Sequence, residues 1–185
     1  MNDDFIRKSR AMATTYDLRP ANEADVQAVA ELHVRAWQMA YRGLMPESYL
    51  SSLQPRDWAK RYDFSPGDRT KPTTLVALEG ERVLGFATVS AHACGCAGRL
   101  SALYVDPDLW GQGCGRALVG AARERLVQLG CHEAELWVVV GNERAEQFYR
   151  RDGWVADGIE KVDKIRGIAV HQRRYRRSLL ETGSR

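Results

Sequence analysis

Residues 100–118 read LSALYVDPDLWGQGCGRAL and carry the strongest indication of the fold in the chain. Its first part, from Leu100 to Val105, is an apolar run that ends at Asp106-Pro107, a pattern typical of a buried strand. Three alternate glycines follow, and the residues after them carry apolar side chains at helical spacing: Leu118, Ala121, Ala122, Leu126 and Leu129. The stretch therefore predicts a strand, a glycine-rich turn and a helix that ends at Gly130.

The three glycines, Gly111, Gly113 and Gly115, lie immediately before the first turn of this helix. Glycine lets the backbone curl and approach a ligand closely, and successive free N–H groups then point into one concavity. The helix N-terminus adds a partial positive charge, and Arg116 adds a formal one. Glycines also serve ordinary loops, but this placement favours a site for a phosphate or a pyrophosphate.

Two common nucleotide-binding turns fit this stretch poorly. A dinucleotide turn of the form G-x-G-x-x-G needs a third glycine where this chain has Arg116. A P-loop needs Lys-Ser or Lys-Thr after its last glycine, and here Gly115 is followed by Arg116-Ala117. The phosphate ligand is therefore expected to belong to another class of molecule.

Outward from this stretch, the chain reads as one strand, two helices, three strands, a helix, a strand, a helix and two strands. Strands are expected near residues 15–19, 74–79, 83–90, 100–105, 134–140, 154–159 and 168–176. Helices are expected from Asn22 to Gly43, over 46–53 with a restart over 55–64, after the glycines, and over 142–151. Only the passage from Leu100 to Val140 has a crossover long enough for parallel strands. We therefore predict a single α/β (α+β) domain with a mixed, mostly antiparallel sheet flanked by helices.

This domain is expected to span residues 15–179, between an N-terminal extension over 1–14 and a short tail over 180–185. The composition, 44% hydrophobic and 28% charged, excludes a disordered chain and a disulfide scaffold. The net charge of +3 is too small to imply nucleic acid or a membrane surface as a partner. The longest apolar run, 136–140, is too short to cross a bilayer, and four cysteines without a paired framework suit a reducing compartment. The predicted location is the cytoplasm.

The quoted stretch also carries a family resemblance. Residues 103–107 and 111–118 resemble the acyl-coenzyme A motif of the GCN5-related N-acetyltransferases. Further along, residues 142–154, NERAEQFYRRDGW, resemble the second signature of the same family. The resemblance extends by element order over roughly residues 16–179 and is specific from about 100 to 154. Two ordered motifs in a strand–helix context are much stronger evidence than either motif alone.

The resemblance implies that acetyl-coenzyme A is the co-substrate, with its pantetheine arm between a splayed parallel pair, the family's fourth and fifth strands. The binding residues that it implies are Leu103, Tyr104, Val105, Gly111, Gln112, Gly113, Cys114, Gly115, Arg116 and Asn142. In one respect the chain departs from the family, which usually has Gln or Arg where this chain has Trp110. A polar or cationic side chain is missing there, and Arg116 is expected to take more of the phosphate charge.

Tyr149 is the candidate general acid that protonates the leaving thiolate. Reference pKa values are about 10 for a phenol and about 8.5 for a thiol, so this transfer needs the hydroxyl to be held at the sulfur. The alternative is an ordinary half-buried tyrosine, and the second signature favours the acid. Asn142 is expected both to cap its helix and, by resemblance, to contact coenzyme A.

No general base can be named. The glutamate that serves some members of the family corresponds to Arg99, and the remaining titratable candidates have no supporting context: His33, His92, Glu135 and His171. His33 reads as a core histidine, since it shares an apolar helix face with Trp37. By resemblance, Trp37 and Tyr41 are expected to line the acceptor pocket, although aromatic residues four apart on a helix are also typical of a core.

The sequence thus predicts an N-acetyltransferase in which a primary amine, on a small molecule or a peptide, attacks acetyl-coenzyme A directly. The alternatives are a non-catalytic module that binds acyl-coenzyme A and an NAD-dependent oxidoreductase. His92-x-Cys94-x-Cys96 lacks the fourth ligand of a structural zinc site, so no metal is predicted. The basic run 173–177 reads as a solvated strand. A homodimer is an expectation from the family alone.

Overall fold

The computed structural model describes residues 16–180, except residues 66, 68–70, 94 and 166. The predicted extension over 1–14 and nearly all of the tail over 180–185 therefore lie outside the described residues. The strands are β1 (Asp17–Pro20), β2 (Thr73–Glu79), β3 (Arg82–Ala91), β4 (Ala97–Val105), β5 (Glu133–Val139), β6 (Val155–Ile165) and β7 (Ile168–Ser178). The helices are α1 (Val26–Ala40), α2 (Glu47–Ser52), α3 (Pro55–Ala59), α4 (Cys114–Gln128) and α5 (Glu143–Arg151), with 3-10 turns at Glu23–Asp25 and Pro107–Leu109.

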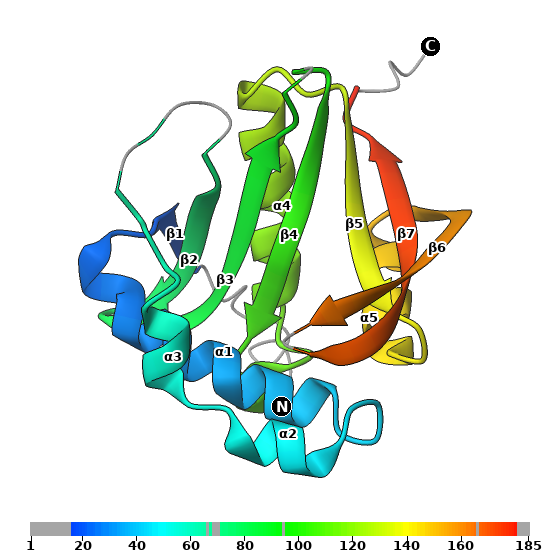
Figure 1. Cartoon of the computed structure of the whole chain (residues 1–185). Helices are drawn as coiled ribbons and strands as arrows, with labels where there is room; N and C mark the ends of the chain where they lie inside the picture. Colours follow the sequence, from blue (N-terminus) through cyan, green and yellow to red (C-terminus); the bar gives the residue numbers. More distant parts are fainter. Residues whose placement is uncertain (1–15, 66, 68–70, 94, 166, 181–185) are drawn as a thin grey trace, which may run out of the picture.

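One sheet organises the molecule, with its seven strands in the order β1-β2-β3-β4-β5-β7-β6. Every neighbouring pair is antiparallel except β4 and β5, which are parallel and joined through α4. The mixed, mostly antiparallel sheet predicted from the sequence is therefore confirmed. The helices α1, α2 and α3 lie on one face of the sheet, and α4 and α5 lie on the other (Figure 1).

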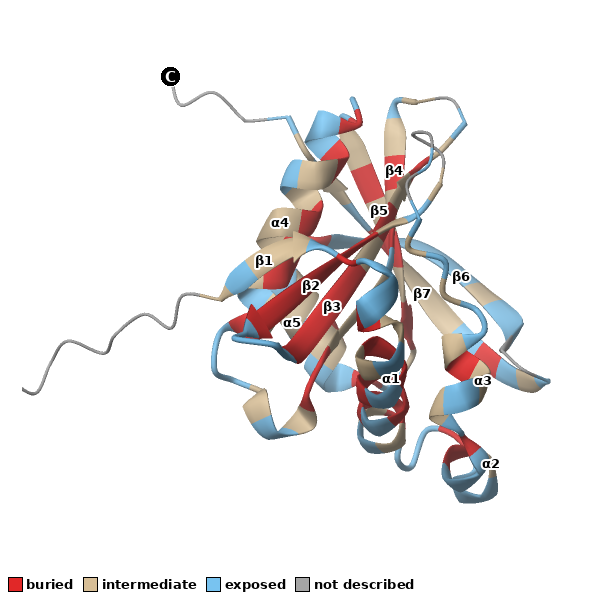
Figure 2. Ribbon diagram, turned by 90° about the vertical axis from the view of Figure 1, so that its left-hand side faces the viewer, coloured by how far each residue is buried: buried red, intermediate tan, exposed pale blue. Residues whose placement is uncertain are grey.

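Two layers of core form around the central strands, which are buried on both faces (Figure 2). On the α4 side, the apolar face predicted for the helix packs on the sheet, with Leu118, Ala122, Leu126 and Leu129 all buried. On the α1 side, Val29, Leu32 and Ala36 pack against Val76 and Phe86. None of the helices in the described part of the chain is long and apolar enough to cross a membrane.

The start of α1 follows the capping pattern of the sequence. The Ala24 N–H donates to the Asn22 side chain at 2.9 Å, and the Asn22 N–H donates to the Asp25 carboxylate at 2.8 Å. Arg19 on β1 donates to both carboxylate oxygens of Asp25, at 2.7 and 2.9 Å, which ties the helix start to the sheet. Asn22 and Asp25 thus form a capping box, although the first turn is 3-10 and α1 itself begins at Val26.

Two elements end furthest from where the sequence predicts. The helix expected over 55–64 ends at Ala59. Strand β6 runs to Ile165, six residues beyond the expected 154–159, because β7 lies alongside it and supplies partners such as Arg173 for Glu160. Such cross-strand partners are remote in sequence from the strand that they stabilise, so local pattern does not show them.

Candidate active site

The parallel pair β4–β5 comes apart soon after it forms. The strands pair only through Ala97–Arg99 and Glu133–Glu135, and no further pair joins them in the described structure. Just past Arg99, β4 carries a bulge, since Thr88 pairs with Ala102, Val89 pairs with Leu100, and Ser101 is left over. A bulge bends its strand and increases the local twist, which turns β4 away from β5. The two strands then diverge (Figure 1).

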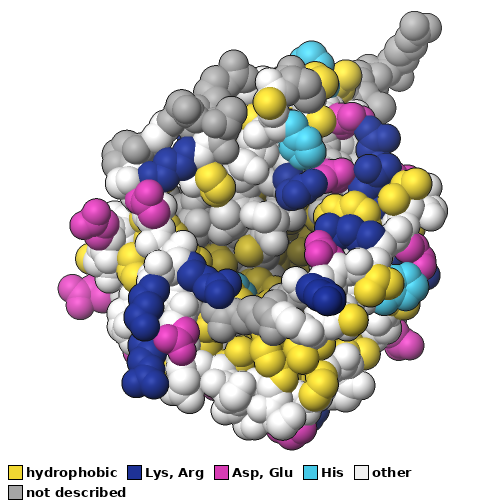
Figure 3. Space-filling model, in the orientation of Figure 1, with side chains coloured by type: hydrophobic (Ala, Val, Ile, Leu, Met, Phe, Trp, Pro, Cys, Tyr) yellow, Lys and Arg dark blue, Asp and Glu magenta, His cyan; other side chains and the backbone are white. Residues whose placement is uncertain are grey.

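A cavity of about 710 Å³ occupies the space between the diverging strands. Its walls are residues 100–105 of β4 and 136–139 of β5, and parts of α1, α5 and the turn before α4 complete the lining. Each strand is paired along its outer edge, β4 with β3 and β5 with β7, so the backbone groups that face the gap are available to a ligand. The space-filling view shows a hollow with apolar side chains in its floor and basic side chains around it (Figure 3).

The glycine-rich turn lies at this cavity. Gly111 and Gly113 have φ angles of 81° and 96°, in the left-handed region, and no atom lies within 4 Å of where their Cβ atoms would be. Conformation rather than space therefore requires glycine at both positions. Gly115 differs, since its Cβ would lie 3.4 Å from Phe148 and its small size lets α4 approach α5. Gly113 begins α4 without a side-chain hydrogen bond of its own, and the Tyr16 hydroxyl is hydrogen-bonded to the backbone of Cys114. The other N–H groups of the first turn are left to a ligand or water.

Most of the residues predicted to bind the donor do line the cavity: Leu103, Tyr104, Val105, Gly111, Gly113, Gly115, Arg116 and Asn142. Asn142 is buried and accepts a hydrogen bond from the Ala145 N–H at 3.2 Å, which confirms it as the cap of α5. Gln112 and Cys114 do not line it: the Gln112 amide donates to the Asp108 carbonyl, and the Cys114 side chain is fully buried in the core. For these two, a contact through the backbone stays a prediction.

Tyr149, on α5, and Tyr41, the residue at the C-terminal end of α1, both line the cavity. Burial raises the pKa of the Tyr149 phenol well above its usual 10, so the hydroxyl stays protonated at neutral pH. The hydroxyls of Tyr41 and Tyr104 lie 3.2 Å apart. Trp37 does not line the cavity, because its side chain packs in the core among Tyr41, Tyr49 and Trp58.

No carboxylate or histidine among the described residues lines the cavity. Arg99, at the position of the family's glutamate, instead forms an ion pair with Glu135, and Glu135 is also 3.4 Å from Arg174. His33 is buried between Trp58 and Tyr104, with Nδ1 hydrogen-bonded to the Tyr62 hydroxyl. The core role predicted for His33 is confirmed, and the described cavity lining offers no carboxylate or histidine as a general base.

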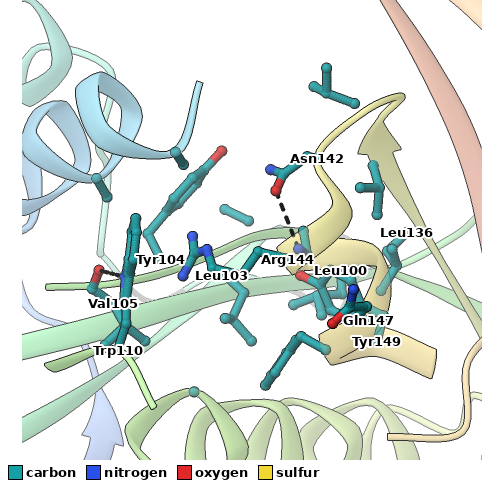
Figure 4. A pocket seen from close by; sticks show the side chains of 18 of the residues that line it. Leu100, Leu103, Tyr104, Val105, Trp110, Leu136, Asn142, Arg144, Gln147 and Tyr149 are labelled. Atoms are coloured by element: carbon teal, nitrogen blue, oxygen red, sulfur yellow. Dashed lines mark hydrogen bonds between the residues drawn. The ribbon is translucent and has the colours of Figure 1, made fainter. Parts of the chain in front are cut away.

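Arg144, in the first turn of α5, was not among the site residues predicted from the sequence. Its guanidinium lies over the indole of Trp110, with Cζ 3.2 Å from the ring centroid, and both side chains line the cavity (Figure 4). The Trp110 Nε1–H donates to the Val105 carbonyl at 3.0 Å, which fixes the ring. Arg144 lies within the second signature, but only the spatial neighbourhood of Trp110 gives this side chain a role.

The chain belongs to the acetyltransferase (GNAT) family, whose sequence profile matches residues 27–154. It is thus an acyltransferase. YuaI, an uncharacterised N-acetyltransferase of Bacillus subtilis, is 30% identical over 129 residues, which cover 68% of this chain and 72% of YuaI. MJ1207, an uncharacterised N-acetyltransferase of Methanocaldococcus jannaschii, is 29% identical over 175 residues, which cover 86% of this chain and 72% of MJ1207.

The fold is that of solved acetyltransferases. The PaiA N-acetyltransferase of Thermoplasma acidophilum, crystallised in complex with coenzyme A, superposes with a TM-score of 0.69 at 20% identity. That match covers 89% of this chain and 99% of PaiA. The putative acetyltransferase YncA of Salmonella typhimurium, solved with acetyl-CoA, gives a TM-score of 0.63 at 17% identity and covers 93% and 98% of the two chains.

Proposed function

We propose that the protein is an N-acetyltransferase that moves the acetyl group of acetyl-coenzyme A to a primary amine on a small molecule or a peptide. One observation carries the proposal: the gap between β4 and β5 opens beside the N-terminus of α4, which begins at a glycine turn. This geometry matches a long, thin donor that has a diphosphate at one end and an amide-containing arm at the other. The cytoplasm as location and a homodimer as assembly stay predictions from composition and family.

In this proposal, the diphosphate of the donor binds at the N-terminus of α4, where backbone N–H groups and the helix dipole favour an anion. The pantetheine arm then runs between the strands and takes up their inward-facing backbone groups. Residues 103–105 supply an N–H for the thioester oxygen, and the arrangement of the cavity wall supports this assignment. A donor aimed at the developing oxyanion typically lowers the barrier by roughly 3 kcal/mol.

The chemistry is a direct transfer. The neutral amine attacks the carbonyl carbon, a tetrahedral intermediate forms, and its collapse breaks the carbon–sulfur bond. Tyr149 gives its phenolic proton to the departing thiolate, and the proton lost by the amine nitrogen returns through water to the phenolate. Only the neutral amine is nucleophilic, and the described cavity wall holds no carboxylate, so water takes up the proton that the amine loses. No metal takes part in the proposed reaction.

The test is a transfer assay that follows release of free coenzyme A over a panel of polyamines, amino acids and peptides. We expect acetyl transfer to at least one amine class. Tight binding of coenzyme A without turnover on any amine would favour a non-catalytic binding module. Calorimetric binding of NAD but not of coenzyme A would favour the oxidoreductase and contradict the proposal.

A further inference from the structure

We propose that Arg144, stacked on Trp110, is the cation that binds the diphosphate of the acyl donor in this chain, a reading that rests on the proposed function. Family members usually have Gln or Arg at the position of Trp110, so in this chain the polar group has moved to another element. Arg144 lies on α5, 34 positions after Trp110 in the chain, and its side chain extends across the gap to the turn. The pair thus restores a positive charge at residue 110 without a basic residue there.

The position of the guanidinium supports this role. It lies 3.2 Å from the centroid of the Trp110 ring, and Gly111 follows Trp110 directly. The same cavity is lined by Gly113, Gly115 and Arg116, so the guanidinium and the N-terminal end of α4 face one space. The close view shows Arg144 entering this space from α5, between Trp110 and the labelled residues of α5 (Figure 4).

Stacking leaves the hydrogen-bonding edge of the guanidinium unused. An arginine on an aromatic ring contacts it through its planar face, whereas its five N–H groups lie in the plane and point outward. Those N–H groups match the oxygens of a phosphate in a bidentate arrangement. Because the Trp110 ring is itself fixed by its hydrogen bond to Val105, the guanidinium is held in one orientation before a ligand arrives.

The charge on Arg144 also lacks a counter-charge within the described structure. The charged or ionisable groups that act on it are the phenols of Tyr41 and Tyr149, and burial lowers its pKa. Arg150, on the same helix, shows the contrast, since it pairs with Glu146 at 2.6 Å and donates to Tyr175 at 3.0 Å. Arg144 is exposed, so an anionic ligand can reach its guanidinium from solvent and supply the counter-charge that the described residues lack.

Calorimetric titration with three probes tests the assignment: coenzyme A, dephospho-coenzyme A, which keeps the diphosphate, and pantetheine, which lacks it. We expect Arg144→Gln to weaken the binding of both coenzymes by roughly ten- to hundredfold, as for loss of a charged hydrogen bond. Binding of pantetheine should stay unchanged. Arg150→Gln is the matched control, because it removes the same charge from the same helix outside the cavity. It should leave the affinities for all three probes unchanged.

A double-mutant cycle tests the role of the indole. Trp110→Leu should weaken coenzyme A binding when Arg144 is present and should cause little further loss of affinity in the Arg144→Gln background. Trp110→Arg in that background should restore part of the affinity, because it returns a cation to the family position. Thermal unfolding of each variant checks that the fold is kept, and affinities are compared only among folded variants.

The possible failures are distinct. If the wild-type chain binds no coenzyme A, the proposed function itself is contradicted. If the wild-type chain binds coenzyme A and Arg144→Gln binds it equally well, the function stands and the assignment of Arg144 is overturned. Weaker binding of coenzyme A with unchanged binding of dephospho-coenzyme A would place Arg144 at the 3′-phosphate and also overturn the assignment to the diphosphate.

Discussion

Burial changes the acid–base behaviour of Tyr149, the phenol proposed to protonate the leaving thiolate. Desolvation disfavours the phenolate and raises the pKa of Tyr149, so the proton is present at every pH at which the enzyme is expected to work. The same shift makes the hydroxyl a weaker acid, so it can act only if it is held at the sulfur. The sequence pattern identified Tyr149, and its burial in the folded structure keeps the phenol protonated.

Tyr149→Phe should lower kcat by roughly a hundredfold or more, since a positioned general acid typically contributes that much. Binding of coenzyme A, followed by calorimetry, should stay nearly unchanged because the ring is kept. Equal turnover by the phenylalanine variant would remove Tyr149 from the mechanism.

The pH profile of the wild-type enzyme follows from the same shift. The rate should rise with pH as the acceptor amine loses its proton, and the raised pKa of Tyr149 keeps this phenol protonated up to about pH 10. We therefore expect no descending limb below pH 10 that depends on Tyr149. A descending limb near neutral pH that disappears in Tyr149→Phe would contradict this assignment.

Gly113 tests the backbone conformation of the turn. At a φ of 96°, an alanine is strained, and Gly113→Ala should cost about 1 kcal/mol or more of stability and weaken donor binding. Gly120 in the middle of α4 is the matched control, because it is helical and a Cβ there has room. Gly120→Ala should raise the free energy of unfolding by about 0.5–1 kcal/mol. Chemical denaturation measures both changes, and equal effects would exclude the conformational argument.

Helix starts fix the elements that carry the site. Asn142 caps α5 and lines the cavity, and Asp25 with Asn22 caps the turn that leads into α1. Both caps are short-range patterns, visible in sequence because the cap and the N–H that it satisfies are separated by two or three residues. Local capping residues therefore mark both helix starts in the sequence.

Two substitutions separate the structural role of Asn142 from its predicted contact with the donor. Asn142→Ala should cost about 1 kcal/mol of stability through the lost cap and should also weaken coenzyme A binding. Asn142→Asp keeps a capping oxygen, so stability should be kept, while a negative charge facing the donor weakens binding. If Asn142→Asp binds coenzyme A as tightly as the wild type, the contact with the donor is excluded.

The start of α1 should be sensitive to acid. The hydrogen bonds from Arg19 hold the pKa of the Asp25 carboxyl below its usual range, so its contribution to stability is present above about pH 4 and is lost as the pH falls further. Asp25→Asn should cost about 0.5–2 kcal/mol at pH 7 through the weakened cap and ion pair. Urea denaturation at pH 7 and pH 3 measures this, and the difference between variant and wild type should shrink at pH 3.

Across the whole molecule, the site exists because a sheet is incomplete in one place. Seven strands pair along the sheet, but β4 and β5 separate past Arg99 and Glu135. The bulge at Ser101 turns β4, α4 fixes the far end of the gap, and α1 with Tyr41 closes one side. No element alone contains the cavity.

Hydrogen exchange measures this arrangement directly. Amides of residues 100–105 and 136–139 that face the gap lack a strand partner, so they should exchange faster than those that face β3 and β7. Coenzyme A should protect the gap-facing amides and leave the amides of β2 unchanged. Protection limited to the glycine turn would indicate that the pantetheine arm does not lie between the strands.

The order of elements, the glycine turn, the helix caps and the family follow from sequence alone, because each depends on residues close together in the chain. The register of β6 with β7, the core position of Trp37 and the ion pair between Arg99 and Glu135 could not be read in this way. The width of the cavity and the placement of Arg144 on Trp110 depend on how the chain folds. The physical reason is that side chains far apart in sequence meet only after the sheet has fixed the distance between α5 and the turn.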